Sequence, residues 1–142
     1  MICTSNNCSN IFEEFAGSSE FTIFTRFIKQ AGLVDYLKNT ENLIVFVPNN
    51  AAFNKLDKAI INALKNPENY QILSNILKFH ITFGKILKKD ITTTHQYVTV
   101  EGNSVVIYKF DGKYFVNKIK INRKITKKNG IIFVIDEVMI PN

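Results

Sequence analysis

The sequence predicts a single α+β domain with a largely antiparallel sheet. Apolar residues recur at helical spacing through the first half of the chain, whereas after Ile81 they alternate with a period of two. One early apolar run, residues 43–47, interrupts the helical half and is typical of a buried strand. Because 142 residues fit one domain, we expect a polar tail over residues 1–10 and the domain over residues 11–142.

Helices are expected where a polar residue that can cap a helix precedes an apolar stripe of helical spacing. Ser18 and Ser19 precede the first stripe and Gly32 ends it, while Pro67 stands at a helix start, where its missing N–H costs nothing. The expected helices cover residues 19–31, 33–37, 51–56 and 67–79. The apolar stripe of the last helix consists of Ile72, Leu73, Ile76 and Leu77.

Turn residues separate the strands expected in the second half. Asp111 and Gly112 give the strongest hairpin signal, because both residue types tolerate the positive φ angles of a two-residue turn. Further turns are expected at residues 101–103 and 129–130, and His95 is expected in an exposed loop. The expected strands cover residues 97–100, 105–108, 114–116, 119–121 and 131–135.

The composition is that of an ordinary globular protein, with 46% hydrophobic and 21% charged residues. No apolar run approaches the roughly 20 residues of a transmembrane helix, and no charged start followed by an apolar stretch indicates a signal peptide. The sequence contains no Gly-rich phosphate loop, no Gly-x-Ser-x-Gly and no His-Glu-x-x-His. We therefore expect no enzymatic activity, no cofactor and no metal site.

The positive charge lies almost entirely in the second half. The formal net charge is +6, and residues 76–142 hold 12 basic and 5 acidic side chains. Such a basic half is typical of proteins that bind a nucleic acid, an anionic polysaccharide or a membrane surface. The alternative is a solvated face whose lysines reflect A/T-rich codons. Nucleic acid is the less favoured partner, because no recognition-helix motif is present.

One basic stretch is a candidate binding surface for heparin-like polysaccharides, which bind such patches by charge. Lys118 and Lys120 are expected on one strand face, with Ile119 and Ile121 on the other. The candidate residues are Lys118, Lys120, Arg123, Lys124, Lys127 and Lys128.

The two cysteines, Cys3 and Cys8, both lie in the expected tail. They are either free thiols or, in an oxidising compartment, the two ends of a small disulfide loop. Asn7 begins a match to the glycosylation sequon, which has meaning only in a secretory pathway.

Three segments, taken in order, resemble the fasciclin-type domain family. Residues 43–53 read LIVFVPNNAAF and resemble the first signature of the family. Residues 76–81 read ILKFHI and resemble its Tyr-His motif, with Phe79 in place of the tyrosine. Residues 129–141 read NGIIFVIDEVMIP and resemble the closing signature, which usually has histidine where Phe133 stands. The resemblance covers residues from about 11 to 141.

The resemblance implies a wedge of about seven mostly antiparallel strands with several α-helices. It also implies a non-enzymatic, usually extracellular role in adhesion to cell-surface or matrix proteins, integrins or polysaccharides, from a domain that stands alone as a monomer. The signature positions, which we expect to be structural, are Phe46, Pro48, Asn49, Asn50, Phe53, Phe79, His80, Asn129, Gly130, Ile135, Asp136 and Pro141.

Each signature position has a structural role that its chemistry suggests. Phe46 and Phe53 are expected to hold a helix against the sheet, and Asn49 or Asn50 to cap that helix. His80 is expected to be a neutral histidine bonded within the fold, near Asn49 or Asn50. Asp136 is expected to accept backbone hydrogen bonds at the end of a strand, and adjacent acids on a strand point to opposite faces.

One departure from the family bears on its partners. Matrix members of the family carry an Asp-Ile adhesion motif just before the closing signature, and the matching positions here are Lys124 and Ile125. A base thus replaces the acid that the resemblance would place at an integrin's metal ion. Three functions remain open: an adhesion domain, a binding module for anionic polysaccharide, and an intracellular or viral relative with a changed partner.

Overall fold

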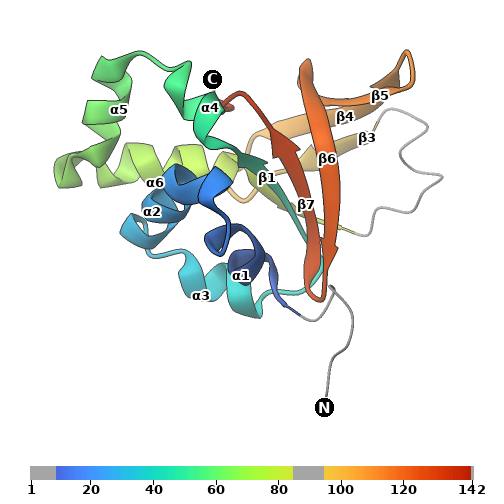
Figure 1. The fold of residues 1–142 in the computed structure, drawn as a ribbon, viewed down its shortest axis with the longest axis horizontal. Helices are drawn as coiled ribbons and strands as arrows, with labels where there is room; N and C mark the ends of the chain where they lie inside the picture. The colour runs from blue at the N-terminus through green and yellow to red at the C-terminus, as the bar shows by residue number, and fades with distance from the viewer. Residues whose placement is uncertain (1–8, 85–94, 142) are drawn as a thin grey trace.

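Seven strands form one curled sheet with the shape of a wedge (Figure 1). The computed structural model describes residues 9–84 and 95–141. The strand order is β2-β1-β7-β6-β5-β4-β3, and every neighbouring pair is antiparallel except β1 with β7. The strands are β1 (Leu43–Pro48), β2 (Ile81–Phe83), β3 (His95–Val98), β4 (Ser104–Phe110), β5 (Lys113–Val116), β6 (Ile119–Lys127) and β7 (Gly130–Ile135).

The two edges of this sheet meet and protect each other. Thr82 of β2 pairs with Thr99, directly after β3, and its hydroxyl donates to the carbonyl of Val98 at 2.6 Å. The N–H of Val100 donates to the carbonyl of Ile81 at 2.9 Å. These contacts join the first and last strands of the order, and they pair the carbonyls of Ile81 and Val98 inside the molecule.

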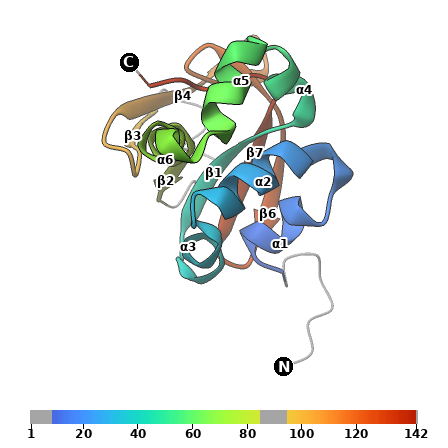
Figure 2. The ribbon, with the colours of Figure 1, turned by 90° about the vertical axis from the view of Figure 1, so that its left-hand side faces the viewer.

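The helices gather beside β1 and β7 and leave β3, β4 and β5 uncovered on their outer side (Figures 1 and 2). The expected helices are confirmed, and α1 and α5 are additional. The α-helices are α1 (Ile11–Ala16), α2 (Thr22–Gln30), α3 (Val34–Asn39), α4 (Asn50–Asn54), α5 (Lys58–Lys65) and α6 (Tyr70–Phe79). The 3₁₀ turns are η2 (Ser19–Phe21) and η3 (Pro67–Asn69).

Two apolar clusters lie on opposite faces of the central strands. Leu43, Val45 and Val47 of β1 belong to the cluster under the helices, which we call the helical core. Ile44 and Phe46 belong to the cluster inside the curl of the sheet, which we call the sheet core. All six residues of β1 are therefore buried, and this explains why the strand is a continuous apolar run and not an alternating one.

The two signature phenylalanines lie in different clusters. Phe53 of α4 packs against Phe27, with ring centroids 5.6 Å apart, and so holds α4 to the helical core as expected. Phe46 instead stacks on Phe133 in the sheet core, with ring centroids 5.7 Å apart. Phe79 and Ile135 also lie in the sheet core.

Three local expectations differ from the structure. Ile72 was expected in the buried stripe of α6 but is 56% exposed, because the helix turns this position away from the helical core. His95 was expected in a loop but begins β3, where it pairs with Ile107. Asn10 was expected in the tail but caps α1, accepting a hydrogen bond from the N–H of Glu13 at 2.8 Å. Cys3, Asn7 and Cys8 lie outside the described residues.

Candidate functional site

His80 joins the end of α6 to the C-terminal segment. Its side chain is 1% exposed, and its ring packs edge-on to Phe24. The N–H of Met139 donates to Nε2 at 3.0 Å, so Nε2 must accept and the proton is on Nδ1, which donates to the carbonyl of Ile76 at 2.7 Å. Burial lowers the pKa of His80 from 6.5 to about 4, so the ring is neutral at neutral pH.

His80 has the structural role that was expected, but its hydrogen-bond partners differ from the expected ones. They come from the preceding turn of α6 and from Met139, not from the backbone near Asn49 and Asn50. The carbonyl of His80 accepts from the N–H of Phe46 at 2.8 Å. Both ring nitrogens are occupied inside the fold, which leaves none for a ligand.

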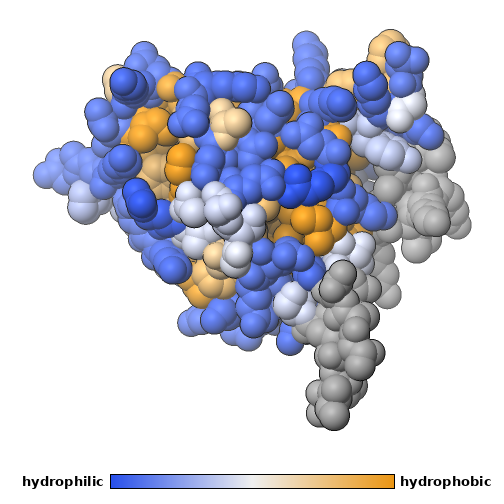
Figure 3. Space-filling view, viewed as in Figure 1, coloured by the Kyte–Doolittle hydropathy of each residue, from blue (hydrophilic) through white to orange (hydrophobic). Residues whose placement is uncertain are grey.

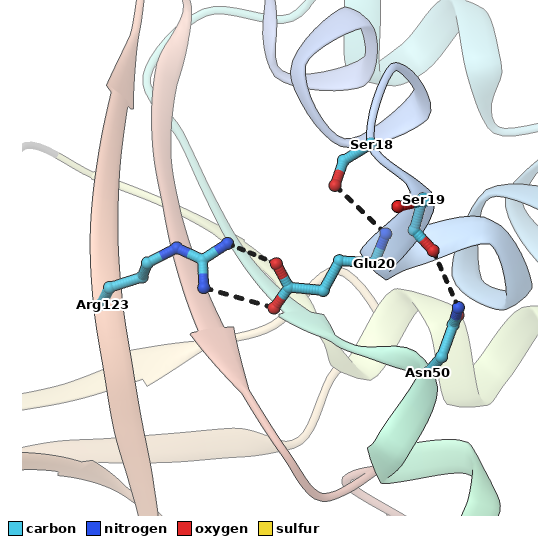
Figure 4. A network of polar contacts seen from close by, with 5 residues as sticks. All are labelled: Ser18, Ser19, Glu20, Asn50 and Arg123. Carbon is cyan, nitrogen blue, oxygen red and sulfur yellow. Dashed lines mark hydrogen bonds and ion pairs between the residues drawn. The ribbon is translucent and has the colours of Figure 1, made fainter.

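The two signature asparagines perform different capping tasks. Asn49 caps α4, accepting from the N–H of Ala52 at 2.9 Å. The side chain of Asn50 reaches another helix: it accepts from the N–H of Ile23 at 3.0 Å and donates to the carbonyl of Ser19 at 3.0 Å (Figure 4). Asn50 therefore satisfies the free amide at the start of α2, which has no capping side chain of its own.

Asn129 and Gly130 tie the start of β7 to three other elements. The buried side chain of Asn129 accepts from the N–H of Ile11 at 2.9 Å and donates to the carbonyls of Leu37 and Thr40 at 2.8 and 2.9 Å. Next to it, Gly130 lies so close to β1 that an added Cβ would come within 2.1 Å of the carbonyl oxygen of Leu43. Only glycine allows this approach.

The remaining signature residues lie at the opposite end of the central strands. Pro48 and Ile135 end the parallel pair opposite each other, where the Pro48 ring, which has no N–H, closes β1. Asp136 was expected to accept backbone hydrogen bonds and instead pairs with Nζ of Lys55 at 3.5 Å, with both side chains about half exposed. Pro141 lines a hollow of about 280 Å³ with Ile72 and Ile140.

Two of the six candidate basic residues are held by acids of the N-terminal helices. Arg123 makes two hydrogen bonds to the carboxylate of Glu20, at 2.7 and 3.2 Å (Figure 4). Its guanidinium also lies over the ring of Phe21. These hydrogen bonds raise the pKa of Arg123. Lys127 pairs with Glu14 at 2.9 Å, and only 3% of its side chain is exposed. Both side chains face the helices, and they bind the chain to itself.

The other four basic residues are exposed and follow β6 along its length. Lys118 occupies the turn before the strand, Lys120 and Lys124 lie on it, and Lys128 follows it. Lys124 pairs across the sheet with Phe133, on the face opposite the helices. At about 3.3 Å per residue, the four span on the order of 30 Å. They do not share one face: Lys120 points away from the sheet core that its neighbour Ile121 enters, whereas after the bulge Lys124 lies on the face of Phe133. We call them the β6 lysines.

Residues 9–84 and 95–141 contain neither a metal-binding cluster nor a membrane-spanning helix. No group of three or more histidine, cysteine, aspartate or glutamate side chains there is arranged to hold a metal ion. In the same part of the chain, no helix has both the length and the apolar character needed to cross a bilayer.

The fold is an α+β wedge of seven strands with helices on one side, in which β1 and β7 pair in parallel in the middle of the sheet. The chain belongs to the fasciclin family: the model of the fasciclin domain matches residues 19–141. The expected family and fold are thereby confirmed, including the α+β class and the number of strands.

Relatives in bacteria share about a third of the sequence. Protein sll1483 of Synechocystis sp. is 32% identical over 137 residues, which are 96% of this chain and 76% of that protein. The cell surface glycolipoprotein MPB83 of Mycobacterium bovis is 34% identical over 110 residues, 77% of this chain and 48% of that protein.

The fold also matches a solved structure of the family. A pair of FAS1 domains from the insect cell adhesion molecule Fasciclin I has a TM-score of 0.79 and 20% sequence identity. The match covers 94% of this chain and 51% of that chain. At this identity the likeness extends to the fold alone.

Proposed function

We propose that this chain is a non-enzymatic adhesion or binding domain that acts at a surface or in the extracellular space through protein or glycan partners. The observation that carries the proposal is that the polar signature side chains, apart from Asp136, are used within the fold. The polar side-chain atoms of His80, Asn129 and Asn50 form hydrogen bonds that connect elements of the fold. Recognition is therefore left to exposed side chains outside the signatures.

The relatives support a role at a surface. One relative is named as a cell surface glycolipoprotein, and the solved structure of the same fold comes from a cell adhesion molecule. The family is known for non-enzymatic adhesion roles. For this chain we propose a secreted or surface-associated location and a monomeric state.

A second candidate is a module that binds anionic polysaccharide through the β6 lysines. Four exposed cations spread over about 30 Å of β6 suit an extended polyanion better than a single small anion. Arg123 and Lys127 contribute less to such a surface, because their charges are already matched by Glu20 and Glu14.

Attachment of cells to the immobilised domain tests the proposal and separates the two candidates. We expect cells to attach, and EDTA and soluble heparin serve as separate competitors. Loss with EDTA alone indicates a metal-dependent receptor, and loss with heparin alone indicates the β6 lysines. No attachment under any condition would contradict adhesion as the function and leave the fold unaffected.

The Lys124→Asp variant sharpens this assay. It restores the acid of the family's Asp-Ile motif beside Ile125, which packs against the helical core. If the family's integrin motif requires only this acid, the variant gains attachment that EDTA removes. Lys124→Gln, which removes the charge without adding a metal ligand, is the matched control.

A further inference from the structure

The tip of the β4–β5 hairpin carries an aromatic side chain that the fold does not use. Phe110 is 68% exposed, more than any other large apolar side chain in residues 9–84 and 95–141. It is the last residue of β4, pairs with Lys113 of β5, and stands directly before the Asp111–Gly112 turn. The hairpin projects away from the helices at the upper right of Figure 1, and Figure 3 shows an apolar spot there among hydrophilic residues.

The hairpin holds Phe110 in this position. The turn has φ angles of 53° at Asp111 and 75° at Gly112, which fit the two-residue turn that matches the twist of an antiparallel pair. Behind the tip, the rings of Tyr108 and Phe115 stack with centroids 5.4 Å apart and an interplanar angle of 12°. The exposure of Phe110 is therefore built into a regular hairpin.

Positive charge surrounds the aromatic tip. Lys113 is the cross-strand partner of Phe110, and Lys120 is the cross-strand partner of Phe115 on the same face of the sheet. Lys109 lies on the other face, with Nζ over the ring of Tyr114, and Lys118 lies at the far end of β5 from the tip. Asp111 is the one acidic residue in the sequence between residues 102 and 135. The partner that matches this surface is anionic.

A protruding phenylalanine among lysines matches the chemistry of a lipid headgroup layer. The ring can enter the boundary between headgroups and acyl chains, while the flexible lysine stems keep their ammonium groups at the phosphates. A soluble polyanion would engage the same lysines but would leave Phe110 in water. Only the lipid surface gives both features a partner.

We propose that the tip of the β4–β5 hairpin docks the domain onto an anionic lipid bilayer. Phe110 enters the interface, and Lys113 and Lys120, which lie on the same face of the sheet, bind the headgroups. This contact is weak and reversible, because one aromatic side chain and a few lysines bind a membrane much less strongly than a lipid anchor or a transmembrane helix does. It is distinct from the adhesion proposed above and leaves the opposite side of the molecule free for a protein partner.

Sedimentation of the full chain with vesicles tests the proposal. We expect binding to vesicles of equal parts phosphatidylglycerol and phosphatidylcholine, and much weaker binding to phosphatidylcholine alone. Phe110→Ser should lower the partition coefficient by about ten-fold or more. Lys113→Gln and Lys120→Gln should each lower it by about five-fold.

Matched controls separate the hairpin from the rest of the surface. Ile72→Ser removes another exposed apolar side chain, on α6, and Lys58→Gln removes a lysine of α5, at the opposite end of the molecule in Figure 1. Both should bind vesicles like the unchanged chain. The far-ultraviolet circular dichroism spectrum of each variant shows whether it has folded.

Tryptophan fluorescence distinguishes the lipid surface from other polyanions. The chain contains no tryptophan, so Phe110→Trp places a single reporter at the tip. We expect its emission to shift to the blue with the anionic vesicles and not with soluble heparin, whereas Ile72→Trp should shift with neither. Binding to heparin without binding to vesicles, or vesicle binding that Phe110→Ser leaves unchanged, would overturn the proposal.

Discussion

The imidazole of His80 stabilises this fold only in its neutral form. Protonation would put a second N–H at Nε2, opposite the N–H of Met139, and would place a charge in a site that is 1% exposed. The ring therefore links the stability of the C-terminal segment to pH.

We expect the stability of the domain to fall as the pH decreases from about 6.5 to about 4. Burial lowers the pKa of His80 from 6.5 to about 4 in the folded chain, so in this interval the unfolded chain binds a proton that the folded chain does not. The full contribution is present above pH 6.5, and the total loss by pH 4 is about 3 kcal/mol.

Thermal melting of the unchanged chain, His80→Gln and His95→Gln across this interval measures the effect. The slope of stability against pH should be smaller in His80→Gln and retained in His95→Gln. A slope that survives the loss of His80 would contradict the assignment. At neutral pH, His80→Ala should cost about 2–4 kcal/mol, because it leaves a cavity and removes the acceptor for Met139.

Gly130 is a second single position on which the fold depends. An alanine Cβ would meet the Leu43 carbonyl oxygen at 2.1 Å and Cδ1 of Ile11 at 2.8 Å, so β7 would have to move away from β1. We expect Gly130→Ala to cost at least about 2 kcal/mol of unfolding free energy in urea denaturation. Gly17→Ala is the control, because its new Cβ would come no closer than 3.2 Å to the backbone oxygen of Glu13 and 3.9 Å to that of Glu14.

At the scale of elements, two ion pairs attach β6 to the N-terminal helices, and they differ in burial. Glu14 pairs with a lysine whose side chain is 3% exposed, whereas Glu20 pairs with an arginine whose side chain is 48% exposed. We expect Glu14→Gln to cost about 1–3 kcal/mol and Glu20→Gln less than about 1 kcal/mol. Urea denaturation of the two variants measures this order, and equal losses would contradict it.

The elements that the sequence predicted are those whose signals are local. Asp111 and Gly112 form the expected hairpin turn, and Asn49 forms the expected cap. Helix α1 was missed although Asn10 and Glu13 form a capping box, a spacing that could have been read. Helix α5 gave little signal because Leu64 is its one buried residue.

The partners of the candidate basic residues could not be predicted in the same way. Arg123 meets Glu20 across 103 positions of sequence, and nothing near either residue indicates the pairing. The parallel register of β1 with β7 was equally hard to predict from the sequence. Both strands are apolar runs, and such runs are compatible with several positions in a sheet. The sequence therefore predicted that β6 is basic but not which of its charges are free to bind.

At the scale of the whole molecule, the two surfaces proposed for anionic partners lie on neighbouring strands. The excess of positive charge belongs to residues 76–142, which include β3 to β7, while the helices hold the acids that pair with Arg123 and Lys127. The candidate polysaccharide surface and the proposed lipid surface both lie on strands β4 to β6, so a polyanion could compete with lipid.

We expect heparin affinity to depend steeply on salt and on the β6 lysines if the polysaccharide candidate is correct. On a heparin column, the variant that combines Lys124→Glu with Lys128→Glu should elute at clearly lower salt. Both the salt and the loss of these two cations weaken the electrostatic attraction to heparin. Lys58→Glu changes the net charge on α5 and should elute nearly with the unchanged chain. Equal shifts for all of these variants would mean that net charge alone determines retention.

The parallel pairing of β1 with β7 has a consequence for how the chain reaches this fold. Leu43 pairs with Gly130 and Pro48 with Ile135, so the middle of the sheet joins segments made early and late in synthesis. Until residues 130–135 have been synthesised, β1 has no partner strand on one side. Both apolar clusters also lack the residues that β7 contributes to them. This long-range pairing predicts slow folding that is completed only after residues 130–135 have been synthesised. A nascent chain of this domain should therefore expose apolar surface until β7 has been made.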